Sequence, residues 1–142
     1  MTMETFSRAD LVDFVRRCSR GVVATLGGGD GPEAALVDVA VTDVGELVFD
    51  SRSEARKIAH IAADPRVALV IGFGDESLQV EGLAEVVTGA ARLEYGRQYE
   101  AWFPRARALV DGFSVVVVTP QWCRFYDAGQ VPARIVESDL RA

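Results

Sequence analysis

The sequence predicts a mainly β protein with flanking helices, in which an antiparallel sheet closes or half-closes into a barrel. Three observations indicate this fold class. Six or seven mostly short runs of β-branched and aromatic residues are separated by tight turns, three segments have a helical pattern, and the strand-like runs mostly follow one another directly. A doubly wound nucleotide-binding sheet would instead alternate strands with helices, so that fold is not expected.

The first helical segment follows Ser7, which has the features of an N-cap. Asp10 stands three residues later, apolar residues recur at helical spacing up to Cys18, and Gly21 follows the expected last turn. We therefore expect an amphipathic opening helix whose apolar side faces the core.

Two further helices are expected in the middle of the chain. One begins near residue 54 with Ser53 as its cap, and Pro65 stops it. The other covers residues 89–103 and ends at Pro104, because proline cannot continue a helix.

The strands are expected between glycine-rich and polar turns. The stretch 27–32 ends in Pro32 and leads into a strand rather than a helix, which favours a hairpin turn over a phosphate-binding loop. Gly82 interrupts another strand, where a bend or bulge is expected. The expected strands are residues 21–26, 33–41, 46–50, 66–73, 78–87, 113–120 and 122–127.

Composition limits the function classes. The chain has 142 residues and 49% hydrophobic content, which fits a single domain over residues 1–142. A net charge of -6 argues against a nucleic-acid partner, and no apolar stretch is long enough for a membrane span or a signal peptide, so a cytoplasmic protein is expected. Cys18 and Cys123 are expected to be reduced thiols rather than a disulfide.

Two adjacent cations stand where the second helix begins. Arg56 and Lys57 fall in its first turn, where positive side chains oppose the helix dipole unless an anion is bound. The hydroxyls of Ser51 and Ser53 lie close by in sequence and can donate hydrogen bonds. This pattern predicts a site for a phosphate monoester, with a forked contact from Arg56 and a point charge from Lys57.

Other interpretations of these polar residues stay open. Arg56 and Lys57 also fit a solvated helix face, paired with Glu54 or Asp50. His60 is a lone histidine with no ligands at metal spacing, so we expect a surface or partly buried residue and no metal site. The sequence contains no nucleophile elbow, paired-carboxylate signature or CxxC motif.

Several stretches together resemble a known family. These are "VATLGGGDGPEAALV", "LVFDSRSEARKIAHIAADPRVALVIG" and "LQVEGLAEVV", followed by "WFP" and "VVVVTPQWCRFYD". Over residues 7–127 they resemble the FMN-binding split β-barrel family related to pyridoxamine 5'-phosphate oxidase, and the later part is similar to its general stress protein branch. The resemblance implies a split antiparallel barrel and a homodimer that binds flavin in grooves between the two barrels.

The resemblance also implies cofactor-binding residues. The family's FMN-phosphate segment falls on Asp50, Ser51, Arg56 and Lys57, which keeps both phosphate-binding cations. The family's glutamine that approaches the flavin falls on Gln79. A side-chain amide can donate or accept at a flavin edge, although Gln79 also fits an outward polar strand residue.

Other positions extend or weaken the resemblance. Trp102 and Phe103 are candidates to line the substrate side of the groove, although packing after a helix explains them equally well. Ala55 replaces a family serine, while Ala35 and Ala40 stand where the oxidase carries Arg and Lys. Fewer cofactor contacts and a modest affinity for FMN are therefore expected.

The expected function is that of a flavin-dependent oxidoreductase acting on an unidentified small molecule, with no catalytic residue assigned. Vitamin oxidase activity is not expected, because the oxidase's terminal arginine and histidine motif has no counterpart in "CRFYDAGQVPARIVESDLRA". Two alternatives remain: a deazaflavin-dependent reductase of the same fold, and a non-catalytic flavin-binding or redox-stress protein.

Overall fold

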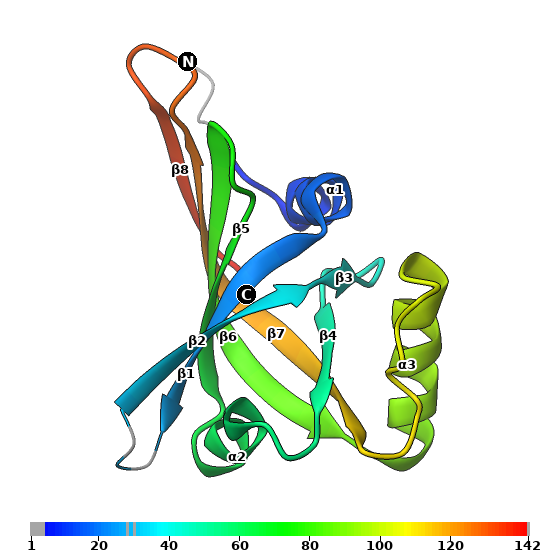
Figure 1. The fold of residues 1–142 in the computed structure, drawn as a ribbon. Coiled ribbons are helices and arrows are strands. Elements are labelled where there is room, and N and C mark those ends of the chain that lie inside the picture. Colours follow the sequence, from blue (N-terminus) through cyan, green and yellow to red (C-terminus); the bar gives the residue numbers. More distant parts are fainter. Residues whose placement is uncertain (1–4, 28, 30, 142) are drawn as a thin grey trace.

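The computed structural model describes residues 5–27, 29 and 31–141 (Figure 1). Residues 1–4, 28, 30 and 142, which fall within the domain expected over residues 1–142, lie outside this part. The described part contains three helices and eight strands. They are α1 Arg8–Cys18, β1 Arg20–Gly27, β2 Gly31–Asp38, β3 Ala40–Val41, β4 Leu47–Arg52, α2 Arg56–Ala63, β5 Arg66–Ile71, β6 Glu76–Val87, α3 Gly89–Trp102, β7 Phe113–Asp127 and β8 Arg134–Asp139.

The strands form one antiparallel sheet in the order β2-β1-β5-β6-β7-β4-β3, and β8 pairs with β7. The sheet curls into a half-barrel around the core (Figure 1). Helix α2 lies at its lower end in this view, while α1 and α3 lie to its right. The predicted fold class, a mainly β split barrel with flanking helices, is confirmed. The pairing of β1 with β2 confirms the expected hairpin, although residues 28 and 30 of its turn lie outside the described part.

The long strand β7 contains a bulge opposite Gly82. Glu81 pairs with Trp122 and Gly82 pairs with Pro120, so Gln121 is an extra residue on β7. A Cβ atom at Gly82 would lie 2.4 Å from a backbone oxygen of β7, which explains why glycine is needed there. The predicted irregularity at Gly82 is confirmed. The bulge also explains why residues 113–120 and 122–127 look like two strands in the sequence but form one.

The opening helix begins as predicted and ends differently. Ser7 Oγ accepts from the backbone N–H of Asp10, and the Asp10 carboxylate accepts from the backbone N–H of Ser7, which forms a capping box. The helix ends at Cys18, and Ser19 takes the left-handed conformation with φ 54°. Gly21 instead lies in β1, where a Cβ atom would meet the backbone of β5 at 2.4 Å.

One expected strand is divided, another ends earlier than expected, and one strand was not expected. The segment 33–41 is divided into β2 and β3, and β5 ends at Ile71 rather than at residue 73. Strand β8 lies in the tail, where charged residues obscure the alternation around Val136, which is 4% exposed. This segment forms a strand because it pairs with β7 over six residues, and its local sequence alone does not predict one.

The core fills the inside of the curled sheet. Phe14 of α1, Phe49 of β4 and Leu78 of β6 are among the large side chains shielded from solvent there. Cys18 and Cys123 are both free thiols, and only Cys123 is buried, whereas Cys18 is half-buried. Burial raises the pKa of the Cys123 thiol to about 11, so this thiol stays protonated near neutral pH.

Candidate functional site

The start of α2 is the first part of the candidate site, and it differs in detail from the prediction. The helix begins at Arg56 with Ala55 as its N-cap, and no side chain caps it. Ser53 is not the cap, because its hydroxyl lies 2.8 Å from Ser114 Oγ on β7. The first backbone N–H groups of α2 therefore have no side-chain acceptor among the described residues.

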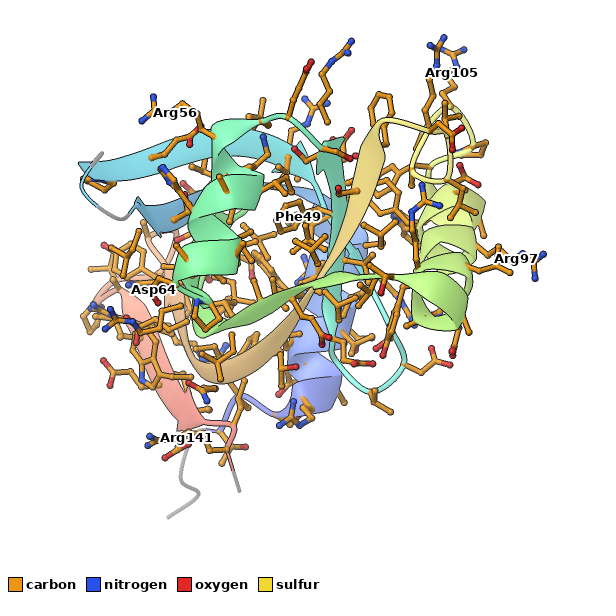
Figure 2. The ribbon with its side chains drawn as sticks, turned by 90° about the horizontal axis from the view of Figure 1, so that it is seen from below. Phe49, Arg56, Asp64, Arg97, Arg105 and Arg141 are labelled. Carbon is orange, nitrogen blue, oxygen red and sulfur yellow. The ribbon has the colours of Figure 1, made fainter. Side chains whose placement is uncertain are left out.

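The two cations of this helix are not neutralised. Arg56 is exposed and extends outward from the start of α2 (Figure 2), and Lys57 is half-buried. In residues 5–27, 29 and 31–141, neither side chain forms an ion pair or a hydrogen bond with Glu54, Asp50 or another group. Pairing with Glu54 or Asp50 is therefore not found, whereas the exposure of Arg56 fits the alternative of a solvated helix face (Figure 2).

Hydroxyl groups lie on β4, which precedes this helix, and on the neighbouring strand β7. Ser51 is buried on β4, donates to the carbonyl of Arg52 at 3.0 Å, and pairs in register with Ser114 of β7. Ser114 was not identified as a candidate site residue in the sequence analysis. Its only signal was a serine at the start of an otherwise apolar run, "SVVVV", where a buried polar residue needs a partner.

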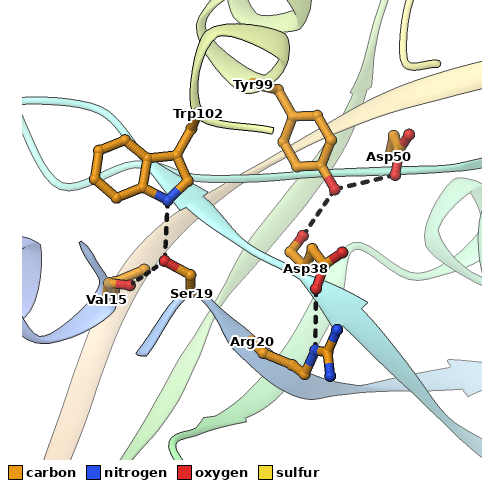
Figure 3. Close-up of polar contacts among 7 residues, drawn as sticks. All are labelled: Val15, Ser19, Arg20, Asp38, Asp50, Tyr99 and Trp102. Carbon is orange, nitrogen blue, oxygen red and sulfur yellow. Dashed lines mark hydrogen bonds and ion pairs between the residues drawn. The ribbon is translucent and has the colours of Figure 1, made fainter. Parts of the chain in front are cut away.

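Asp50 faces away from this group. Neighbouring residues of a strand point to opposite sides, and Asp50 lies toward α3 (Figure 3). Tyr99 of α3 donates to Asp50 Oδ1 at 3.1 Å, and the Tyr99 hydroxyl also lies 3.0 Å from the carbonyl oxygen of Asp38. Ser51 therefore lies on β4 shortly before the helix that carries Arg56 and Lys57, while the Asp50 carboxylate lies in a different environment.

A cavity of about 440 Å³ adjoins Asp50 at the end of α3. Trp102 and Phe103, the candidate groove residues, both line it, together with Asp38 and Tyr99. Trp102 donates through its indole N–H to Ser19 Oγ at 2.9 Å (Figure 3). The rings of Phe103 and Tyr99 lie 4.9 Å apart. Both aromatic residues therefore combine a packing role with a position on a cavity wall.

Burial controls the ionisation of the groups at this cavity. It raises the pKa of Asp50, and the hydrogen bond from Tyr99 only partly opposes that effect. Burial and the nearby Asp50 charge raise the pKa of Tyr99, so its hydroxyl remains a donor. A half-buried carboxyl beside an aromatic wall can hold a proton to a higher pH than a surface aspartate.

Replacing Asp50 by asparagine should therefore stabilise the protein at neutral pH. The folded state keeps the Asp50 proton to higher pH than the unfolded chain does, because the pKa of this carboxyl is raised from its ordinary value of 3.8. Stability therefore falls as pH rises from that value through the pKa of the folded state. Asparagine retains an acceptor for Tyr99 without the charge. We expect Asp50→Asn to unfold at a higher temperature than the unmodified protein at pH 7, and at the same temperature near about pH 3. A lower midpoint at pH 7 would contradict this.

Gln79 lies in another part of the molecule. It is exposed on the outer face of β6 and lines a separate cavity of about 290 Å³ with Val70, Ser77, Arg124 and Tyr126. The start of β6 lies at the upper end of the sheet in Figure 1, whereas α2 lies at the lower end. Within one chain, the structure does not bring Gln79 together with Arg56 and Lys57.

His60 is buried rather than placed at the surface. It is 4% exposed, and its Nδ1 lies 3.0 Å from Thr25 Oγ1 and 3.7 Å from the Glu33 carboxylate. These contacts join α2 to β1 and β2. No group of three metal-ligating side chains occurs in the described part of the chain.

Comparison with known proteins identifies the family and the fold. The family model described as pyridoxamine 5'-phosphate oxidase matches residues 7–127. The chain belongs to this oxidase family. No curated protein matches the sequence. Among the described residues of this family member, no helix has the length and apolar character needed to cross a membrane.

Solved structures show the same fold as this member of the oxidase family. A heme binding protein from Mycobacterium smegmatis is 21% identical with a TM-score of 0.77, and the match covers 98% of this chain and 60% of that one. General Stress Protein 26 from Bacillus anthracis is 18% identical with a TM-score of 0.68, covering 85% and 94% of the two chains. An FMN binding protein related to the oxidase, from Nostoc punctiforme, is 12% identical with a TM-score of 0.63, covering both chains fully.

Proposed function

We propose that the protein binds FMN and acts as a flavin-dependent oxidoreductase on a small molecule. The observation that supports this most directly is the cation pair Arg56 and Lys57 at the uncapped start of α2. In a chain of net charge -6, two adjacent cations without acidic partners among the described residues favour an anionic ligand.

The local chemistry fits a phosphate monoester. Arg56 can offer two parallel N–H donors, Lys57 adds a point charge, and the free N–H groups of the first turn of α2 favour an anion through the helix dipole. Each charge-assisted hydrogen bond contributes on the order of 1.5 to 3 kcal/mol. The Ser51 hydroxyl on β4 donates to the Arg52 carbonyl, so it would have to turn from this partner to donate to a phosphate.

We also propose a homodimer, because a complete flavin site needs both Gln79 and the cations of α2. The middle of the outer face of β1, β2 and β5 is apolar and suits an interface. Leu26, Leu36 and Val70 on this face are 42%, 62% and 44% exposed. Gln79 lies directly beside Val70 on the same face, so association here would place Gln79 at the edge of the interface.

The flavin would supply the hydride or electron transfer, while the chain orients the ring and excludes water. The cavity beside Asp50, with Trp102 and Phe103 on its wall, is a candidate place for a small substrate. Because Cys18 and Cys123 are free thiols, we place the protein in a reducing compartment, the cytoplasm.

The test is a titration of the apo-protein with FMN, riboflavin, a deazaflavin cofactor with an acidic tail, and hemin. Flavin fluorescence and thermal stability are followed together, because a ligand that binds only the folded state raises its stability. We expect FMN to bind at least about tenfold more tightly than riboflavin, since only FMN carries the phosphate. Equal binding of FMN and riboflavin, or tighter binding of the deazaflavin or hemin, would overturn the proposal.

Turnover needs its own measurement. The loaded protein is mixed with a reductant and a panel of electron acceptors, and its rate is compared with that of free FMN at the same concentration. Faster cycling supports an oxidoreductase. Cycling no faster than free FMN would leave a flavin-binding or redox-stress role.

A further inference from the structure

The outer face of the sheet carries one row of side chains that crosses six strands. Strand register aligns Leu36, Val22 and Val70 with Gln79 of β6, Arg124 of β7 and Glu137 of β8. The first three residues are apolar, and the last three are polar or charged. Gln79 and Arg124 therefore stand side by side where the apolar half of the face ends.

The guanidinium of Arg124 is only partly satisfied by hydrogen bonds and ion pairs. Its Nε atom is shielded from solvent and has no hydrogen-bond acceptor among the described residues. Glu137 Oε1 lies 3.9 Å from this atom, which is an ion-pair distance but too long for a hydrogen bond. A guanidinium cannot lose its charge, so a shielded N–H without an acceptor carries a desolvation cost that a ligand would remove.

The cavity around Arg124 has the chemistry of a site for a planar ring with polar edges. Its volume is about 290 Å³, and it is lined by Val70, Ser77, Gln79, Arg124 and Tyr126. Val70 and the ring of Tyr126 offer apolar surface to the face of a ring. The guanidinium, the amide and the hydroxyls offer donors to carbonyl oxygens and acceptors to an N–H group.

We propose that Arg124 donates to the carbonyl edge of the flavin's pyrimidinedione ring, on the subunit opposite the one whose Arg56 and Lys57 hold the phosphate. The proposal rests on the proposed function. The phosphate of FMN ends a flexible ribityl chain that is attached to the central ring, so it can bind at a distance from the carbonyl edge. The two donor sets likewise occupy separate places in the chain, at α2 and on the outer face of β6 and β7 (Figure 1).

A fixed positive charge at this edge has an electronic effect. Reduction of the flavin places negative charge on the pyrimidinedione part of the ring, and Arg124 would stabilise that charge. Sulfite is a convenient probe of the same effect. Its sulfur forms a bond to the flavin N5, and the electron pair of the ring moves to the pyrimidinedione, so no reductant or turnover is needed.

The first experiment measures two dissociation constants. The constant for FMN is measured with the apo-protein, and the constant for sulfite with the FMN-loaded protein. We expect Arg124→Gln to weaken both by about tenfold or more, because a hydrogen bond to a charged donor is lost. Arg124→Lys should recover most of the sulfite affinity, since it restores the charge, but less of the FMN affinity. A purely structural role would not separate the two constants in this way.

Arg97→Gln is the matched control. Arg97 lies on α3 and points away from the body of the protein (Figure 2), and its loss changes the net charge by the same amount. It should leave both dissociation constants unchanged. Selective FMN binding by the unmodified protein, with Arg124→Gln behaving like Arg97→Gln, would overturn the inference about Arg124 alone. Failure of the unmodified protein to bind FMN would overturn both proposals.

The second experiment tests the division of the site between subunits. Chains with Lys57→Ala and chains with Arg124→Gln are produced together with different affinity tags, and the hybrid dimer is isolated. If the two residues serve one site from opposite subunits, the hybrid contains one intact site and one doubly altered site. We therefore expect unmodified affinity at one site per hybrid dimer. Two equally weakened sites, or isolation of monomers only, would contradict the shared site.

Discussion

Replacing Lys57 by alanine is expected to weaken FMN binding by about tenfold or more and to leave riboflavin binding nearly unchanged. The reason is that Lys57 has no acidic partner in the described part of the chain and is proposed to meet only the phosphate, which riboflavin lacks. Fluorescence titration of both ligands measures the two dissociation constants. An equal loss for both would indicate a folding defect rather than the loss of a phosphate contact.

Two further measurements separate charge from geometry. Arg56→Lys keeps the charge but cannot form a forked contact, so FMN affinity should fall if that contact is bidentate. Lys57 is the only lysine in the sequence, so its reaction with an amine-directed reagent can be followed by mass spectrometry. FMN should protect it from the reagent more strongly than riboflavin does. Equal protection would contradict a phosphate contact.

Replacing Phe49 by alanine is expected to lower the free energy of unfolding by about 3 to 5 kcal/mol. Phe49 is 0% exposed and lies on β4 opposite Val116 of β7, so its loss leaves a cavity inside the half-barrel. That loss is a large part of the roughly 5 to 15 kcal/mol that stabilises a typical domain. Urea denaturation, monitored by the intrinsic fluorescence of the protein, measures it.

The matched control for Phe49 is Phe73. Phe73 is 64% exposed beyond the end of β5, so Phe73→Ala should change the free energy of unfolding by about 0.5 kcal/mol or less. If Phe49→Ala proved equally mild, β4 would not be fixed by core packing. The position of the neighbouring Ser51 would then need another explanation.

Most of the fold could be predicted from local patterns. The β-branched runs, the capping box at Ser7 and the irregularity at Gly82 are each encoded within a few residues, and the structure confirms them. Strand β8 could not be predicted, because its order comes from pairing with β7 rather than from its own alternation. Ser53 was assigned as a cap because it precedes the helix, but in the fold a hydroxyl partner on β7 competes for it.

The candidate site was predictable only where it is local. Arg56 and Lys57 are adjacent in sequence, and their conflict with the helix dipole is visible without a structure. The contact between Asp50 and Tyr99 joins residues on different elements, so only the fold reveals it. Arg124 gave no signal at all, because a charged residue on a strand normally faces water, and its shielded Nε depends on packing.

The extra residue in β7 also determines which of the later side chains of this strand face inward and which face outward. Before Gln121, Val118 and Pro120 face inward, and after it Cys123 and Phe125 do so. Without the insertion, inward positions would continue on even numbers, which would direct Arg124 into the apolar interior and turn Cys123 out to solvent. One unpaired residue thus shifts the alternation by one position, and it determines which side chains β7 presents on its outer face beyond the bulge.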